Sequence, residues 1–62
     1  MYESLSELAS KYRRRADHYR ELASIARNPE MRVTFLQAFA AYDRAATVAE
    51  IQAAEEHKTL HR

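Results

Sequence analysis

One basic segment has residue types and a spacing suited to binding phosphates. Between residues 11 and 20, five Lys or Arg residues accompany a single Asp. On a helix, residues seven apart share a face, so Arg13, Arg20 and Arg27 form one stripe. Arginines in such a row can contact the phosphates of RNA or duplex DNA. The candidate contacts for a nucleic acid or an acidic partner are Lys11, Arg13, Arg14, Arg20 and Arg27.

The same arginines have an ordinary structural interpretation. Their stems can cover the seam between helices while their heads pair with carboxylates, as Asp17 can with Arg13 and Arg20. The net charge of only +1 favours this interpretation. A nucleic acid therefore remains the second choice of partner.

Two histidines have the spacing of a helical metal pair. His57 and His61 lie four residues apart, and Glu56 adds an oxygen, but a third strong ligand is missing from this terminal segment. We therefore predict no metal site and no cofactor. We interpret the segment as a frayed tail, and we expect His18 to be exposed.

The composition argues against catalysis and against a membrane partner. The chain has no glycine and no cysteine, which removes phosphate-cradling loops and thiol nucleophiles. No nucleophile lies in a suitable pattern with a base, and two short helices leave no deep cavity. We therefore expect no enzyme activity and no catalytic residue. Without a long apolar run or an export signal, we expect no membrane partner and a cytoplasmic protein.

The segment Asn28-Pro29-Glu30 divides the chain into two helices. Asn is a favoured N-cap, Pro suits the first helical position, and Glu complements the helix dipole. Ser4 and Glu7 fit a capping box at the first helix. We predict a single all-α domain over residues 1–62, with helices at about 4–27 and 29–57, a turn at 28 and a frayed tail over 58–62. A connection this short makes the helices antiparallel neighbours.

Apolar periodicity indicates how the two helices face each other. In the first helix the row of small residues is Ala9, Ala16 and Ala23, beside a heptad pattern of Leu5, Leu8, Tyr12, Arg15, Tyr19, Leu22 and Ala26. In the second helix the seam is Phe35, Phe39, Tyr42, Ala46, Ala49 and Ala53. Antiparallel pairing brings Tyr12 near Ala45 and Tyr19 near Ala38, so large residues face small ones.

Arg15 is the one charged residue in this apolar pattern. A buried arginine needs an acid or the edge of the interface, because its charge is costly to bury alone. Asp43 lies close to it across the predicted hairpin. We hypothesise that Arg15 and Asp43 form an ion pair that fixes the register between the alanine rows.

The second helix has more apolar surface than one hairpin can use. At 100° per residue, Val33, Ala40, Val48 and Ile51 fall together away from the seam, with Gln37 and Arg44 interleaved, and Leu36 sits between the two faces. The candidate interface residues are Val33, Leu36, Ala40, Arg44, Val48 and Ile51. One interpretation is scattered surface aliphatics on an alanine-rich helix. The other, which we favour, is an interface with a partner, most simply another copy in a homodimeric four-helix bundle.

Part of the chain resembles a group of short helical-hairpin proteins common in alphaproteobacteria. The matching residues are Tyr19-Arg20-Glu21-Leu22-Ala23, Asn28-Pro29-Glu30, Phe35-Leu36, Ala41-Tyr42-Asp43 and Ala45. Ala46 stands where the group often has a larger aliphatic residue. This resemblance implies an architecture and no functional site. In size and plan the chain is also similar to Rop-type RNA-binding hairpin dimers.

These observations together favour a non-catalytic function. We expect a small interaction or regulatory module that acts through a helical surface, with another copy of itself as the first choice of protein partner and a different protein as the second. The alternative is an RNA-binding hairpin dimer that uses the arginine stripe.

Overall fold

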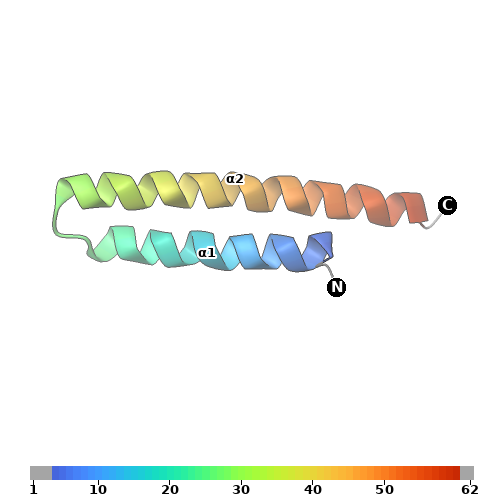
Figure 1. Cartoon of the computed structure of the whole chain (residues 1–62), viewed down its shortest axis with the longest axis horizontal. Helices are drawn as coiled ribbons and strands as arrows, with labels where there is room; N and C mark the ends of the chain where they lie inside the picture. Colours follow the sequence, from blue (N-terminus) through green and yellow to red (C-terminus); the bar gives the residue numbers. More distant parts are fainter. Residues whose placement is uncertain (1–3, 61–62) are drawn as a thin grey trace.

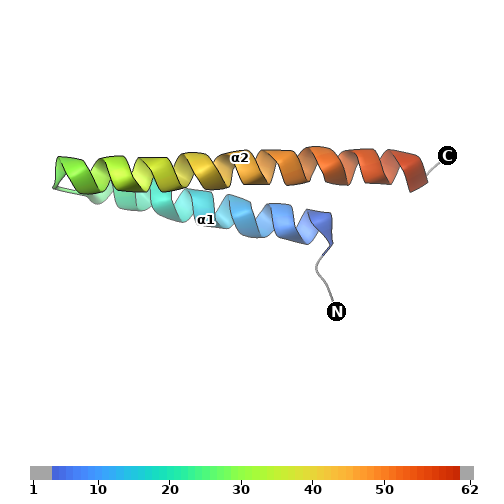
Figure 2. The ribbon, with the colours of Figure 1, turned by 45° about the horizontal axis from the view of Figure 1, so that its top comes forward.

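The protein is an all-α hairpin. The computed structural model describes residues 4–60, with side chains described for residues 4–56. Helix α1 runs over Leu5–Ile25 and helix α2 over Pro29–Leu60, with no strand in this part of the chain. Figures 1 and 2 show the two helices side by side and antiparallel, with the last turns of α2 continuing beyond the start of α1. The predicted fold class and two-helix architecture are confirmed.

Both helices begin at the predicted side-chain caps. The Ser4 hydroxyl accepts a hydrogen bond from the Glu7 amide at 3.1 Å, and the Asn28 side-chain oxygen accepts one from the Glu30 amide at 2.8 Å. Each bond satisfies an amide that the first helical turn would leave without a partner. The proline therefore sits at the first position of α2, where its missing N–H costs nothing.

The end of α1 lies two residues before the predicted boundary at 27. Ala26 is already extended, with φ −66° and ψ 127°, because the chain needs residues 26–28 to reverse direction. The Arg32 guanidinium donates a hydrogen bond to the Ala26 carbonyl oxygen at 2.9 Å. This bond satisfies a carbonyl that the helix end leaves open.

Helix α2 extends past the predicted boundary at 57. Its backbone stays helical through Leu60, so residues 58–60 do not belong to a frayed tail. The residues after Pro29 contain neither glycine nor proline, and nothing in them stops a helix. His61 lies outside the described residues, as does the side chain of His57, so the predicted histidine pair falls beyond this description.

The core between the helices consists of alanines. The buried apolar residues of the described chain are Ala9, Ala16, Ala23, Ala46 and Ala49, and none of its large side chains is fully buried. The first three are the small-residue row predicted for α1. Small side chains let two helix axes approach closely, but each one removes little apolar surface from water. The hairpin is therefore tightly joined and weakly stabilised by its own core.

Aromatic rings lie along one side of the alanine seam. The Tyr42 ring stacks on Tyr19 with centroids 5.6 Å apart, and it contacts Tyr12 at 6.1 Å. Tyr19 also contacts Phe35 at 6.3 Å. The predicted pairing of Tyr12 and Tyr19 with Ala45 and Ala38 did not anticipate these ring contacts. Such ring pairs add to the stability expected from area burial alone.

Candidate interaction surface

An exposed, largely apolar stripe follows α2 on the side away from α1, except that Leu36 borders α1 and lines a depression with Arg20 and Ala23. Its members, which we call the outer stripe, are Val33, Leu36, Ala40, Arg44, Val48 and Ile51. They follow one another at intervals of three or four residues. The first and last members, Val33 and Ile51, are eighteen positions apart, which corresponds to five turns at 3.6 residues per turn. The outer stripe is therefore about 27 Å long with about one side chain on each turn, and Leu36 and Val48 lie about 60° to either side of the line from Val33 to Ile51.

The large members of the outer stripe are strongly exposed. Val33 and Val48 are each 53% exposed, Leu36 is 46% exposed and Ile51 is 54% exposed. Arg44 is exposed as well, and Ala40 is half-buried. Scattered surface aliphatics need no explanation, but a continuous row of them indicates an interaction surface. That a partner covers this row stays a prediction.

An arginine clamp joins the two helices on the other side of the seam from the aromatic rings. The Arg13 guanidinium donates to the Asp43 carboxylate at 2.5 Å and to the Glu50 carboxylate at 2.9 Å. It also donates to the Thr47 hydroxyl at 3.5 Å, and this hydroxyl donates in turn to the Asp43 carbonyl oxygen. One arginine of α1 thus contacts three successive turns of α2. We call Arg13, Asp43, Thr47 and Glu50 the arginine clamp.

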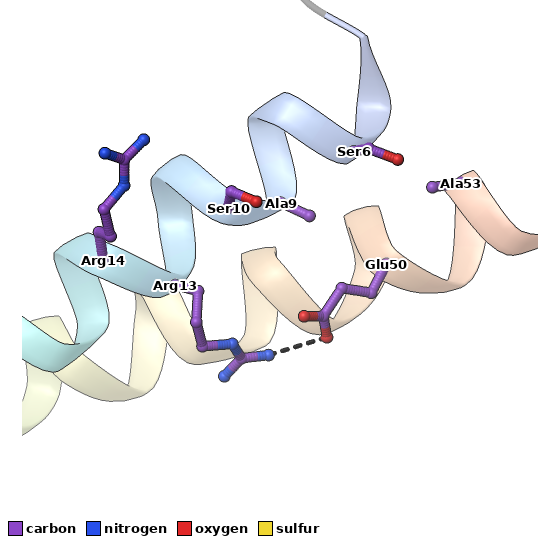
Figure 3. Close-up of a pocket in the computed structure, with 7 residues that line it drawn as sticks. All are labelled: Ser6, Ala9, Ser10, Arg13, Arg14, Glu50 and Ala53. Atoms are coloured by element: carbon purple, nitrogen blue, oxygen red, sulfur yellow. Dashed lines mark hydrogen bonds and ion pairs between the residues drawn. The ribbon is translucent and has the colours of Figure 1, made fainter.

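The clamp borders a shallow depression between the helices. Figure 3 shows Arg13 and Glu50 pointing toward each other, whereas Arg14 points away. The depression is lined by small and charged side chains, namely Ser6, Ala9, Ser10, Arg13, Arg14, Glu50 and Ala53. An open depression of this kind lacks the enclosure of a small-molecule site.

The clamp replaces the predicted pair of Arg15 and Asp43. Asp43 pairs with Arg13, and Arg15 is exposed with no ion pair among the described residues. Two residues along a helix correspond to a rotation of about 200°, so Arg13 and Arg15 flank the alanine row on opposite sides. The predicted acid, Asp43, does form an ion pair across the hairpin, but its partner is Arg13, on the opposite edge of α1 from Arg15.

Hydrogen bonds keep Arg13 protonated. Its bonds to Glu50 and then Asp43 raise the pKa of Arg13 above its ordinary value. A cation with a raised pKa contributes its stability at every pH below its unfolded pKa and loses it only as the pH rises through the folded pKa. Arginine is already protonated at every physiological pH in the unfolded chain. The charge of the clamp arginine is therefore constant over the physiological range.

The three arginines of the predicted stripe lie in different environments in the structure. Arg13 is occupied by the clamp, so it is not a free phosphate contact. Arg20 lines a separate depression near Arg32, and Arg27 lies exposed in the connection between the helices. A different group on α1 shares one shallow depression, and we call it the basic cluster: Lys11, Arg14, Arg15 and His18.

Sequence reasoning missed two members of the arginine clamp. Thr47 and Glu50 follow Asp43 at i+4 and i+7, which places all three on one edge of α2. That spacing was the available signal. It indicates a row of acceptors, but only the observed register between the helices shows that Arg13 is the donor.

Other site classes find no support in the described part of the chain. Among those residues, no three His, Cys, Asp or Glu side chains are grouped as a metal site. Neither helix contains a stretch that is both long and apolar enough to cross a bilayer, within the same residues. Comparison with protein-family models, curated proteins and solved structures gave no match.

Proposed function

We propose that this protein is a small non-catalytic interaction module that binds a helical partner through the outer stripe of α2. The partner we propose first is a second copy of the chain, which makes an assembly of four helices. One observation carries this proposal: the hairpin buries only alanines while Val33, Val48 and Ile51 are each more than half exposed.

The physical reason is that a hairpin of this size lacks enough buried apolar surface. Alanine contributes little to burial, and small domains without disulfides or metals commonly gain stability by association. A fully buried Val, Leu or Ile contributes roughly 1.5–3 kcal/mol relative to an exposed one. Covering the outer stripe therefore stabilises the hairpin by more than any rearrangement of its alanine core.

The test is a charge placed in the centre of the stripe. We expect Val48→Glu to abolish association in sedimentation equilibrium and in chemical crosslinking, because it would bury an unpaired carboxylate. Gln52→Glu is the matched control, since Gln52 is exposed on the same helix but lies off the outer stripe. Helix content of both variants should match the wild type by circular dichroism. A wild-type protein and a Val48→Glu variant that bind alike, to themselves and to every partner, would refute the proposal.

A second candidate function is binding to RNA, favoured by the basic cluster. Lys11, Arg14 and Arg15 are exposed on one depression of α1, together with His18. Clustered cations of this kind bind phosphates with an affinity that falls steeply with salt. The double change Arg14→Glu and Arg15→Glu should then remove binding to a structured RNA. An absence of binding by the wild type at about 50 mM salt eliminates this function.

A further inference from the structure

A depression in the groove between the helices, close to the turn, contains two arginines. It is lined by Arg20, Ala23 and Ser24 of α1 and by Arg32 and Leu36 of α2. We call these five residues the arginine notch. Ala23 is buried between the helices, whereas Leu36 is 46% exposed beside the arginines. The notch therefore combines cations from both helices with an apolar surface, and no acidic residue of the described chain lines it.

The arginine notch and the arginine clamp lie on the same edge of the hairpin. Arg13 and Arg20 are seven residues apart, so they share a face of α1. Because the helices are antiparallel (Figure 1), a step of seven residues forward along α1 corresponds to seven residues backward along α2. That step leads from Asp43, which pairs with Arg13, to Leu36. Arg20 therefore faces a leucine at the position where Arg13 has a carboxylate.

Neither arginine of the notch has a carboxylate partner within the described chain. Arg13 forms two ion pairs, but no described residue forms one with Arg20 or with Arg32. Arg32 uses one N–H to donate to the Ala26 carbonyl oxygen at 2.9 Å, which holds its guanidinium beside the notch. A guanidinium has five N–H donors, so both arginines keep donors for an external anion.

The remaining polar group of the notch supplies no proton to such an anion. The Ser24 hydroxyl already donates to the Glu21 carbonyl oxygen at 2.7 Å. Binding of an anion therefore depends on Arg20 and Arg32. Two cations on one depression favour an anion between them, because like charges repel and opposite charges attract.

We propose that the arginine notch binds an acidic segment of another protein, with a carboxylate on Arg20 and Arg32 and a neighbouring aliphatic side chain on Leu36. Arginine binds carboxylates through two parallel N–H donors, a geometry that lysine does not offer. The apolar part of the notch sets the second requirement. An aspartate or glutamate next to a leucine, isoleucine or valine meets both requirements, whereas the phosphates of RNA carry no aliphatic side chain for Leu36.

This site goes beyond the proposed function, because it needs no second copy and lies in the groove between the helices. The arginine notch and the outer stripe share only Leu36. Val48, where the proposed function is tested, is twelve positions from Leu36, which is about 18 Å along α2. The two proposals can therefore fail independently.

The experiment measures the binding of a small acidic probe to the full chain by NMR. The probe, acetyl-leucyl-glutamyl amide, carries one carboxylate and one aliphatic side chain. At millimolar concentration we expect it to shift the amide signals of Ala23 and Ser24 and the methyl signals of Leu36. The glutaminyl analogue should bind at least about fivefold more weakly, because it loses the charge-assisted hydrogen bonds.

Variants of the notch identify the residues that bind the probe. Arg20→Gln removes one cation and no interaction of the described hairpin, so it should fold normally and bind the probe at least about fivefold more weakly. Arg15→Gln is the matched control, because Arg15 is an exposed arginine of the same helix outside the notch, and it should leave the affinity unchanged. Leu36→Ala should remove the advantage of the leucyl probe over acetyl-alanyl-glutamyl amide, which a double-mutant cycle measures.

Equal binding of the probe to the wild type and to Arg20→Gln, both with normal helix content by circular dichroism, would overturn the proposal. A structured RNA that binds the wild type and is weakened by Arg20→Gln, while the dipeptide causes no shift, would overturn it in favour of a phosphate ligand. Val48→Glu should bind the probe as the wild type does, whatever its effect on association. Loss of probe binding in Val48→Glu would contradict a site confined to the groove.

Discussion

The two long faces of α2 carry apolar side chains of different sizes. Toward α1, the fully buried positions are Ala46 and Ala49, flanked by half-buried rings. On the opposite face, Val33, Val48 and Ile51 are each more than half exposed. In a self-sufficient globular domain the larger aliphatic residues are the ones found inside. In α2 the small alanines are buried and the larger aliphatic residues are exposed.

This reversal shows that the two faces satisfy different requirements. The inner face needs close approach between helices that a short connection already holds together, and alanine allows the closest approach. On the outer stripe, Val33, Val48 and Ile51 are each more than half exposed in the hairpin, so they add little stability to one chain alone.

The largest effect is expected from enlarging a buried alanine. Ala46→Leu forces a branched side chain into a site with no exposed surface, and we expect the free energy of unfolding to fall by about 3 kcal/mol. Urea denaturation followed by circular dichroism measures this loss. Ala41→Leu, on an exposed part of the same helix, should change stability by less than about 0.5 kcal/mol. Equal effects at the two positions would contradict the tight inner seam.

Removing the central ring of the aromatic side should have the next largest effect. Tyr42→Ala eliminates the ring contacts with Tyr12 and Tyr19 and leaves half-buried space behind. We expect a loss of about 2 kcal/mol in the same denaturation experiment. Tyr42→Phe keeps the ring and should stay within about 0.5 kcal/mol of the wild type. A large loss in Tyr42→Phe would instead assign the stability to its hydroxyl.

Breaking the arginine clamp should have a smaller, salt-dependent effect. Arg13→Gln removes the ion pairs to Asp43 and Glu50 but retains a polar side chain. Because these groups are partly exposed, we expect a modest decrease in Tm, smaller than that of Tyr42→Ala. The difference from wild type should shrink between about 50 mM and 1 M salt, since added ions screen the pairs. A difference that is independent of salt would indicate lost packing of the arginine stem.

The smallest effect on the hairpin should come from the outer stripe. In dilute protein, where the hairpin is a monomer, Val48→Ser and Ile51→Ser should change the free energy of unfolding by less than about 0.5 kcal/mol each. At a protein concentration about a hundred times the Kd of the proposed dimer, the free energy of unfolding of the wild type should rise by about 2.7 kcal/mol. The two serine variants should show no such rise. Thermal melts over a range of concentrations measure this gain. A loss of stability in the dilute variants would show that the stripe already packs within one chain.

The helices and their seam were predictable because they follow from local rules. Ser4 and Asn28 have the residue types that cap helices, and both accept the expected hydrogen bonds. The alanine row of α1 is set by a seven-residue repeat, and these alanines are buried. The outer stripe also follows from helical periodicity, and its large members are exposed. Each of these features depends on one helix at a time.

The arginine clamp was not predictable in the same way, because it depends on how two helices meet. Arg13 and Arg15 both lie beside the alanine row, and periodicity alone gives no preference between the two edges. The choice is made by the acceptors on α2, where Asp43, Thr47 and Glu50 line a single edge. The boundary near residue 27 was missed for a related reason, since the reversal of the chain requires residues that local helix propensity would include in α1.

The three-residue connection between α1 and α2 has a consequence for how fast the chain folds. Ile25 and Pro29 are separated by only residues 26–28, so contacts between the helices begin at small sequence separation and extend outward from the turn. Chains dominated by such local contacts have low contact order and fold within microseconds to milliseconds. We therefore expect the hairpin to form faster than two chains meet at ordinary protein concentrations, so that any association would be between hairpins that are already folded.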